Sequence, residues 1–206
     1  ISIDDAYASV YTEAWPRFKA AGFPFTIFVS TDQVGRSANY LTWDQIREMQ
    51  AAGVQVGHHG AAHSHMANAA ADAVETDLER ASETFRQQLG KVPKLFAYPY
   101  GEASLTIKNI VEKKGFSAAF GQHSGVVNSS NDPFYLPRFA LNEAYGDMDR
   151  YRLAVNALPI PAKDISPADM LVTTSNPPTY GFTVDGTVAG LARLNCFASH
   201  ISSAVR

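Results

Sequence analysis

Residues 23–29 read Phe-Pro-Phe-Thr-Ile-Phe-Val, a run rich in aromatic and β-branched side chains. Such a run predicts a buried strand, here Phe23–Ser30. The segment before it, Tyr7–Ala21, has apolar residues at helical spacing, and Gly22 is a typical helix stop. A helix leading into a buried strand is typical of folds built on parallel strands, so this stretch indicates an α/β protein.

The same alternation of strands and helices continues to about residue 156. It predicts parallel strands joined by crossover helices, in an open sheet or a barrel. In both arrangements the functional residues gather on loops that follow the carboxyl ends of strands. Residues 4–5, 58–65, 98–102 and 121–125 all follow predicted strands, so we expect them to face one another. Strands are predicted at Ile1–Ile3, Phe23–Ser30, Val54–Val56, Leu95–Tyr98, Phe116–Phe120 and Tyr135–Leu141, and helices at Tyr7–Ala21, Trp43–Ala52, Ala70–Leu89, Ser104–Lys114 and Asp147–Ala157.

Composition excludes several classes of protein. The chain has 206 residues, 46% of them apolar, which is enough for a sizeable core. A net charge of −3 without a basic stripe argues against a nucleic-acid partner. The single cysteine, Cys196, rules out an intrachain disulfide and a cysteine zinc cluster. No apolar run approaches the roughly 20 residues of a membrane helix, so no transmembrane segment is predicted.

We expect three parts along the chain. Residues 1–157 carry the strand–helix alternation and form the main domain. Residues 158–178 hold five of the eleven prolines and are predicted to be a linker or an extended wrap. Residues 179–206, with strand-like stretches at Tyr180–Val184 and Leu191–Phe197, are predicted to be β-rich. Because the sequence begins on Ile1 inside a strand-like segment and stops abruptly, we expect it to be part of a longer protein.

Asp4 and Asp5 end the first predicted strand. Two carboxylates in one pocket repel each other unless a cation or a shared proton intervenes. One carboxylate can then hold a metal while the other stays free as a base. The alternative is a helix start, because acidic residues favour the positive end of the helix dipole. For an isolated Asp pair, this alternative is the commoner case.

Four of the six histidines fall within His58–His65. His59 and His63 are four residues apart and can converge on one ion. Two histidines and a carboxylate suit zinc or a similar divalent cation, with positions left for water and substrate. The alternative is a solvated loop that binds metal adventitiously, and the tract alone does not decide between the two.

The stretch Phe96–Glu102 reads Phe-Ala-Tyr-Pro-Tyr-Gly-Glu after a predicted strand. Such a turn can offer a backbone N–H to a developing oxyanion and an aromatic wall to a sugar. An ordinary turn that packs its aromatic rings into the core is the alternative, and taken alone it is favoured.

Together the three motifs resemble the polysaccharide deacetylases with a NodB homology domain, carbohydrate esterase family 4. That family's T-F-D-D-G motif is similar to Ser2-Ile3-Asp4-Asp5-Ala6, and its H-[ST]-x-x-H motif to His59-Gly60-Ala61-Ala62-His63. Phe96–Gly101 resembles the third motif in the branch that includes poly-N-acetylglucosamine deacetylases. The three motifs occur in the family's order, and the resemblance covers about residues 1–156.

The resemblance implies a distorted (β/α) barrel of seven or eight strands, followed here by the short β-rich C-terminal segment. It implies a divalent metal, most often zinc and sometimes cobalt or nickel, held by Asp5, His59 and His63. Asp4 would be the general base that activates water for attack on an acetyl carbonyl. The metal and the Tyr100 N–H would stabilise the oxyanion.

Two further assignments follow from the same resemblance. Tyr98, Pro99, Tyr100 and Gly101 would contact the substrate. Arg138 lies where this branch has an arginine that orients the base, and a purely structural salt bridge is an equal alternative for it.

The sequence departs from the family pattern in three places. Ala6 replaces the usual Gly, so the turn must avoid a left-handed backbone or tolerate strain. Gly60 replaces a Ser or Thr whose hydroxyl braces the loop. The histidine that normally supplies the general acid is not identified, since His200 lies in the predicted tail and His123 is only a minor candidate.

We therefore expect a metal-dependent hydrolase that deacetylates N- or O-acetylated carbohydrate polymers. Its partner would be the acetylated polysaccharide or oligosaccharide, and the polymers concerned imply an exported location, although no targeting segment is visible. The alternatives are a small-amide or imide hydrolase on the same fold and a catalytically weak carbohydrate-binding relative. The altered motifs and the unidentified general acid are the observations that support the carbohydrate-binding alternative.

Overall fold

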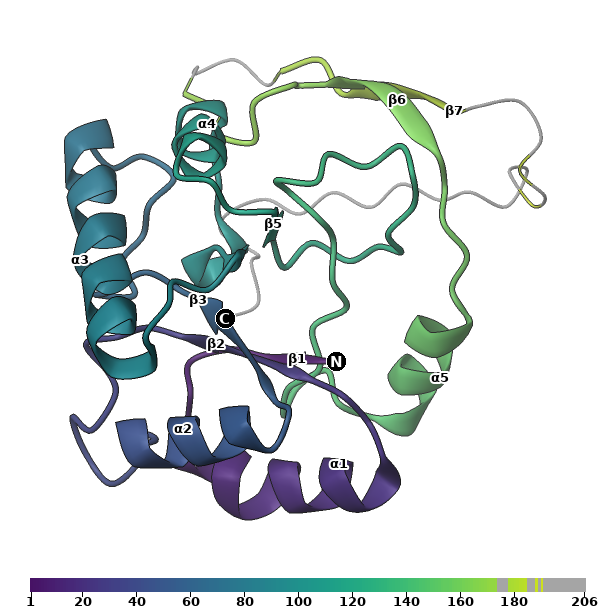
Figure 1. Ribbon diagram of the computed structural model, residues 1–206. Helices are drawn as coiled ribbons and strands as arrows, with labels where there is room; N and C mark the ends of the chain where they lie inside the picture. The colour runs from purple at the N-terminus through teal and green to yellow at the C-terminus, as the bar shows by residue number, and fades with distance from the viewer. Residues whose placement is uncertain (174–177, 185–187, 189, 191–206) are drawn as a thin grey trace.

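The computed structural model describes residues 1–173, 178–184, 188 and 190. Five parallel strands form one curled sheet in the order β1-β2-β3-β4-β5 (Figure 1). The strands are β1 (Ser2–Ile3), β2 (Thr26–Val29), β3 (Gln55–His58), β4 (Leu95–Ala97) and β5 (Ala118–Phe120). Since the spatial order follows the chain order, each strand is joined to its neighbour by a crossover. The predicted distorted β/α barrel architecture is confirmed as a half-barrel, with five strands in this sheet, within the described part of the chain, where seven or eight were expected.

Helices connect these strands and lie around the outside of the curl (Figure 1). They begin and end where local sequence dictates. Thr42 and Gln45 form a capping box at the start of α2, and Gly22 and Gly90 end α1 and α3 in left-handed conformation. The connections are the π-helical turn η1 (Val10–Ala14) with α1 (Trp15–Ala21), α2 (Trp43–Ala51), α3 (Ala71–Leu89), and α4 (Leu105–Lys113), which follows the 3₁₀ turn η2 (Pro99–Gly101).

The core lies between the sheet and its helices. Ile27 and Val29 of β2 pack with Ile46 and Met49 of α2, and all four are fully buried. A second cluster under β4 joins α3 to α4 and includes Phe96. Because side chains alternate along a strand, Phe28 points to the opposite face, inside the curl, where its ring meets that of Phe120.

The segment after β5 differs from the prediction. Only Leu136 of the predicted strand Tyr135–Leu141 pairs with the sheet, through an isolated parallel bridge to Phe120. Pro137 follows at once and has no N–H to continue a ladder, which explains why the strand does not extend. The predicted last helix is present as α5 (Met148–Asn156), with Asp147 as its N-cap.

An antiparallel pair completes the described structure. β6 (Ala162–Ser166) pairs with β7 (Gly181–Val184). β7 coincides with the predicted strand Tyr180–Val184, β6 lies within the stretch expected to be a linker or wrap, and Leu191–Phe197 falls outside the described residues. The division of the chain into three parts stays a prediction. Among the described helices, none is both long and apolar enough to cross a membrane.

Candidate metal centre and active site

Loops from four strand ends meet at one side of the sheet. Asp4 and Asp5 follow β1, the histidine tract follows β3, and the aromatic turn that holds Tyr100 follows β4. Gln122, just after β5, places its side-chain nitrogen 3.3 Å from an Asp4 carboxylate oxygen. Segments that are 118 residues apart in the sequence therefore converge, as expected from the parallel topology.

Asp5, His59 and His63 form a cluster suited to a metal ion. One ligand atom from each lies within 4.8 Å of the others. Asp5 Oδ1 is 2.9 Å from His63 Nε2 and 3.4 Å from His59 Nε2. Both Asp5 Oδ1 and His59 Nε2 are buried without a hydrogen-bond partner within the described part of the chain. Because buried polar atoms are nearly always paired, these two atoms fit ligands of a cation.

Hydrogen bonding and charge set the protonation of the side chains in the cluster. His59 Nδ1 lies 2.7 Å from the Ala97 carbonyl, which can only accept, so Nδ1 carries the proton and Nε2 keeps a lone pair. Burial alone would raise the pKa of Asp5, but the neighbouring rings of His59 and His63 outweigh burial and hold that pKa well below its usual range. The Asp5 carboxylate in turn raises the pKa of His63. A carboxylate that is kept ionised is in the form that can bind a divalent cation.

Asp4 makes a separate ion pair. Arg138 Nη1 and Nη2 donate to the two Asp4 oxygens, each at 2.8 Å. The guanidinium also donates to the Gly121 carbonyl and to Ser2, and it lies over the ring of Phe28 inside the curl. This bidentate contact fixes the orientation of the Asp4 carboxylate beside the cluster. Arg138 is thus brought to Asp4 from 134 positions away.

Strained backbone gathers at the same place. Of the five non-glycine residues with positive φ that the structure describes, Asp5, Ala6, His63 and Tyr100 belong to these loops. Each such residue costs about 1–2 kcal/mol and persists only where its surroundings hold it. Ala6, with φ of 53° and a buried side chain, therefore tolerates the left-handed turn instead of avoiding it.

Within the aromatic turn, the structure separates two kinds of residue. Tyr98 and Pro99 are buried, and the Tyr98 hydroxyl donates to the Phe134 carbonyl. Their predicted contact with substrate is corrected, because side chains enclosed in the core cannot line an open site. Tyr100 exposes its ring, and Gly101 lines an adjoining cavity of about 620 Å³, so both remain candidates.

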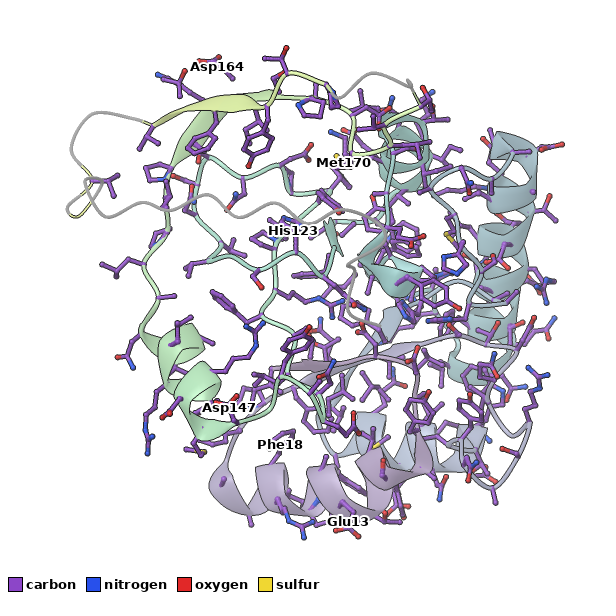
Figure 2. All side chains as sticks on the ribbon, turned by 180° about the vertical axis from the view of Figure 1, so that it is seen from behind. Glu13, Phe18, His123, Asp147, Asp164 and Met170 are labelled. Carbon is purple, nitrogen blue, oxygen red and sulfur yellow. The ribbon has the colours of Figure 1, made fainter. Side chains whose placement is uncertain are left out.

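Sequence reasoning missed several residues of the site. A pocket of about 490 Å³ beside the cluster is lined by Tyr7 and Tyr40, whose rings stack at 5.2 Å, and by Gln122. The sequence signal for Gln122 is its place after a predicted strand, which it shares with its neighbour His123. The ring of His123, which is labelled in Figure 2, stacks on that of Tyr135 and does not join the cluster.

The other histidines of the tract are not part of the cluster. His58 is fully buried against Phe85, Phe96 and Phe116, and burial lowers its pKa to about 3, so it is a neutral core residue. His65 is exposed and stacks on Tyr100 with the ring centroids 3.8 Å apart.

The chain has a curled parallel β/α sheet, with an Asp-His-His cluster and an Asp–Arg pair at its strand ends. These features place it among the β/α-barrel proteins with a candidate metal centre. Within that class, the chain belongs to the polysaccharide deacetylase family, whose model matches residues 1–119, more than half of the sequence.

Individual relatives agree with this assignment. The poly-beta-1,6-N-acetyl-D-glucosamine N-deacetylase of Staphylococcus aureus (strain MSSA476) is 22% identical over 159 residues, which cover 69% of this chain and 54% of that protein. Among solved structures, Streptococcus pyogenes deacetylase PplD in complex with acetate has a TM-score of 0.69 at 22% identity, covering 76% of this chain and 69% of that one. IcaB from Ammonifex degensii has a TM-score of 0.66 at 28% identity, covering 75% of this chain and 70% of that one. The chain spans about half the length of the curated relatives it matches.

The close approach of Gly101 to the site gives a stability prediction. A Cβ on Gly101, at φ +70°, would lie 2.6 Å from the Gln122 backbone nitrogen, whereas a Cβ on Gly22, at φ +69°, would meet nothing within 4 Å. Gly22→Ala should therefore cost only the left-handed backbone, about 1–2 kcal/mol. Gly101→Ala should cost about 1–3 kcal/mol more through overpacking. Urea unfolding midpoints measure both, and equal losses would contradict the packing around Gly101.

Proposed function

We propose that this protein is a metal-dependent hydrolase that removes acetyl groups from acetylated carbohydrate polymers, with N-acetylated glucosamine polymers as the first class to test. One observation carries the proposal: Asp5, His59 and His63 converge beside the Asp4–Arg138 pair, and the buried atoms Asp5 Oδ1 and His59 Nε2 have no hydrogen-bond partner among the described residues. Membership of the polysaccharide deacetylase family supports it. The polymers concerned lie outside the cytoplasm, so we also propose that the protein is exported.

Asp5, His59 and His63 would hold the metal, and zinc suits two imidazoles and one carboxylate best, with cobalt or nickel as substitutes. When bound, the cation supplies Lewis acidity toward water and the acetyl carbonyl. The His59 side chain is fully buried and tied to Ala97, so this ligand is fixed in advance, whereas His63 is partly exposed on the side of the pocket. The open side is where substrate would enter.

Asp4 is the proposed general base. It accepts the proton of the attacking water while Arg138 holds both carboxylate oxygens in place and balances the charge. The Tyr100 N–H is the proposed donor to the oxyanion that forms as the carbonyl is attacked. The left-handed backbone at Tyr100, with φ of 58° and ψ of 4°, sets the direction of this turn. The products are acetate and a free amine or hydroxyl on the sugar.

Aromatic side chains beside the cluster support a sugar substrate. Tyr7 stacks on Tyr40 and Tyr100 stacks on His65, and the three tyrosines line the pocket beside the cluster. His63 contacts the Tyr100 ring at 4.6 Å, so the second pair adjoins the cluster directly. Flat apolar faces beside polar groups are the usual lining of small-molecule sites, and sugar rings pack well on them.

Loss of the Tyr7 ring should weaken substrate binding more than it slows the chemical step. Tyr7→Ala is expected to raise KM for an acetylated glucosamine tetramer about tenfold and to change kcat little, because its ring stands outside the Asp4–Asp5–His cluster. Tyr151→Ala, on α5, is the matched control, since both tyrosines are 45% exposed. Steady-state kinetics of acetate release measure the effect. An unchanged KM, or an equal rise in the Tyr151→Ala variant, would remove the Tyr7–Tyr40 pair from the substrate site.

The proposed activity is tested with a panel of acetylated substrates. Purified protein with zinc should release acetate from N-acetylated β-1,6-glucosamine oligomers, with chito-oligomers and acetylated xylan as comparisons. Release from a small acetamide alone would favour the small-amide hydrolase instead. Binding of the oligomers without release from any of them would indicate a carbohydrate-binding relative.

A further inference from the structure

The loop that joins the two histidines of the cluster is held in a strained shape. Gly60 and His63 have φ values of +73° and +54°. A left-handed histidine costs about 1–2 kcal/mol, so the loop would relax unless its neighbours held it. One side is held by backbone: the Thr31 N–H donates to the Gly60 carbonyl at 3.2 Å, and the Asp32 N–H to that of Ala61 at 3.1 Å.

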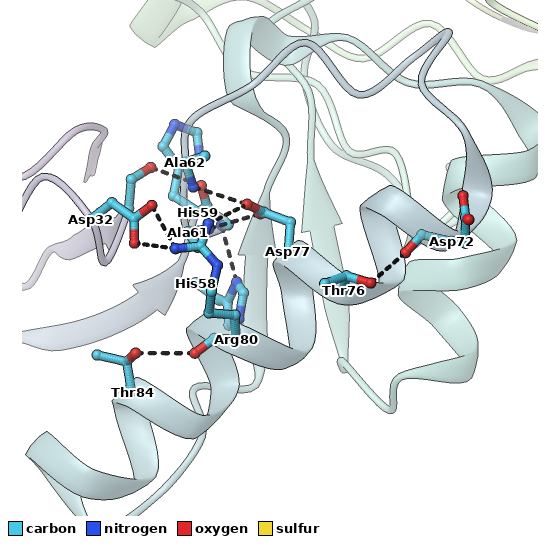
Figure 3. A network of polar contacts seen from close by, with 12 residues as sticks. Asp32, His58, His59, Ala61, Ala62, Asp72, Thr76, Asp77, Arg80 and Thr84 are labelled. Carbon is cyan, nitrogen blue, oxygen red and sulfur yellow. Dashed lines mark hydrogen bonds and ion pairs between the residues drawn. The ribbon is translucent and has the colours of Figure 1, made fainter.

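The other side of the loop is held by one carboxylate from α3. The Ala61 N–H donates to Asp77 Oδ2 at 2.8 Å, and the Ala62 N–H to Asp77 Oδ1 at 3.0 Å. Asp77 is buried, and Arg80, 3.3 Å away, balances its charge. Arg80 also binds Asp32 at 2.6 Å, so a single network ties both sides of the loop to α3 (Figure 3).

Packing shows how closely Asp77 fits the loop. A Cβ on Gly60 would lie 2.8 Å from Asp77 Oδ2 and 2.9 Å from the Met66 side chain. Residue 60 must therefore lack a side chain, both for its backbone conformation and for the space that the carboxylate fills. A hydroxyl at position 60 has no room to brace this loop, and Asp77 supplies the bracing from outside it.

We propose that Asp77 is a positioning residue for the metal centre: by binding the N–H groups between the two histidines, it keeps His59 and His63 directed at the Asp5 carboxylate. This inference rests on the proposed metal site. Without the carboxylate, the buried Ala61 N–H and the partly buried Ala62 N–H lose their acceptors, and the left-handed backbone of His63 is free to relax. His59, tied to Ala97 and fully buried, would stay, so the distance between the two ring nitrogens would change.

The test measures affinity for Co²⁺ alone in the metal-free chain. Asp77→Asn keeps the shape of the side chain but replaces one acceptor oxygen with a donor. Asp72→Asn is the matched control, because Asp72 lies on the same helix, is exposed and also accepts a backbone N–H, that of Ala73 at 2.8 Å. We expect Asp77→Asn to bind Co²⁺ about 10–100-fold more weakly, as is usual when a partner behind the ligands is lost. Its cobalt absorption band should also change, and Asp72→Asn should match the unsubstituted chain in both.

Titrations are run at a temperature at which far-UV circular dichroism shows every variant folded, so a loss of global stability does not enter. If Asp77→Asn does not fold, Asp77→Glu replaces it. The longer glutamate side chain cannot bind both N–H groups with the same geometry, so the same loss of Co²⁺ affinity is expected. A folded variant that binds Co²⁺ within twofold of the unsubstituted chain, with an unaltered band, overturns the inference. If the unsubstituted chain itself binds no Co²⁺, the metal centre fails and this inference fails with it.

Discussion

Asp4→Asn is expected to lower kcat for acetate release by about 10²–10⁴-fold, the range typical of a lost general base. The amide cannot take a proton from water, although it can still accept one hydrogen bond from Arg138. Asp4 is not one of the three clustered ligand groups, so metal affinity should stay within about threefold of the unsubstituted protein. Kinetics and a metal titration on the same sample separate the two effects.

Asp44→Asn is the control for this change. Asp44 is also paired with an arginine, Arg47, but it lies on α2, its side chain is 91% exposed, and it does not line the pocket beside the cluster. It should retain full activity. An Asp4→Asn variant that keeps at least half the activity while folded would contradict the assignment of the base. A variant that loses metal and activity together would show that Asp4 supports the cluster instead.

His63→Asn is expected to abolish both metal binding and acetate release. Asparagine tolerates the left-handed backbone at this position better than most residues, so the substitution removes the imidazole without adding much strain. Two ligand side chains remain, and we expect zinc affinity to fall by more than the roughly 10–100-fold that loss of an outer partner costs. Competition with a coloured chelator measures the affinity.

His65→Asn provides the comparison two residues further along the loop. His65 lies outside the cluster, stacks on Tyr100 and pairs with Glu102, so its loss should leave zinc affinity unchanged. Equal zinc affinities for the His63→Asn variant and the unsubstituted chain would show that His63 is not a ligand.

Local sequence signals predicted the framework of the fold well. The strand at Phe23–Ser30, the helix at Trp43–Ala52 and the glycine stop at Gly22 are short-range features, and the structure has all of them. The strand predicted at Tyr135–Leu141 is wrong, since only Leu136 pairs with the sheet. There, Pro137 and the inward turn of Arg138 toward Asp4 outweigh strand propensity.

The candidate site was predictable where its residues follow strands and not where it depends on tertiary packing. Residues 4–5 and 58–65 were expected to face one another because parallel strands present their carboxyl ends on one side. The family resemblance singled out Asp5, His59 and His63 among them, and these three lie together. The role of Asp77 depends on which face of α3 meets the loop, and periodicity marks Asp77 only as a polar helix residue. The assignment of Tyr98 to the substrate was wrong. The sequence of a turn does not indicate whether an aromatic ring faces solvent or core.

The most direct test of the account is acetate release from N-acetylated β-1,6-glucosamine oligomers, measured as purified, after chelation and after Zn²⁺ or Co²⁺ is restored. We expect release to stop when the metal is removed and to return when either ion is added, but not in the His63→Asn variant. Release that continues at full rate in protein shown by elemental analysis to be free of metal would contradict it.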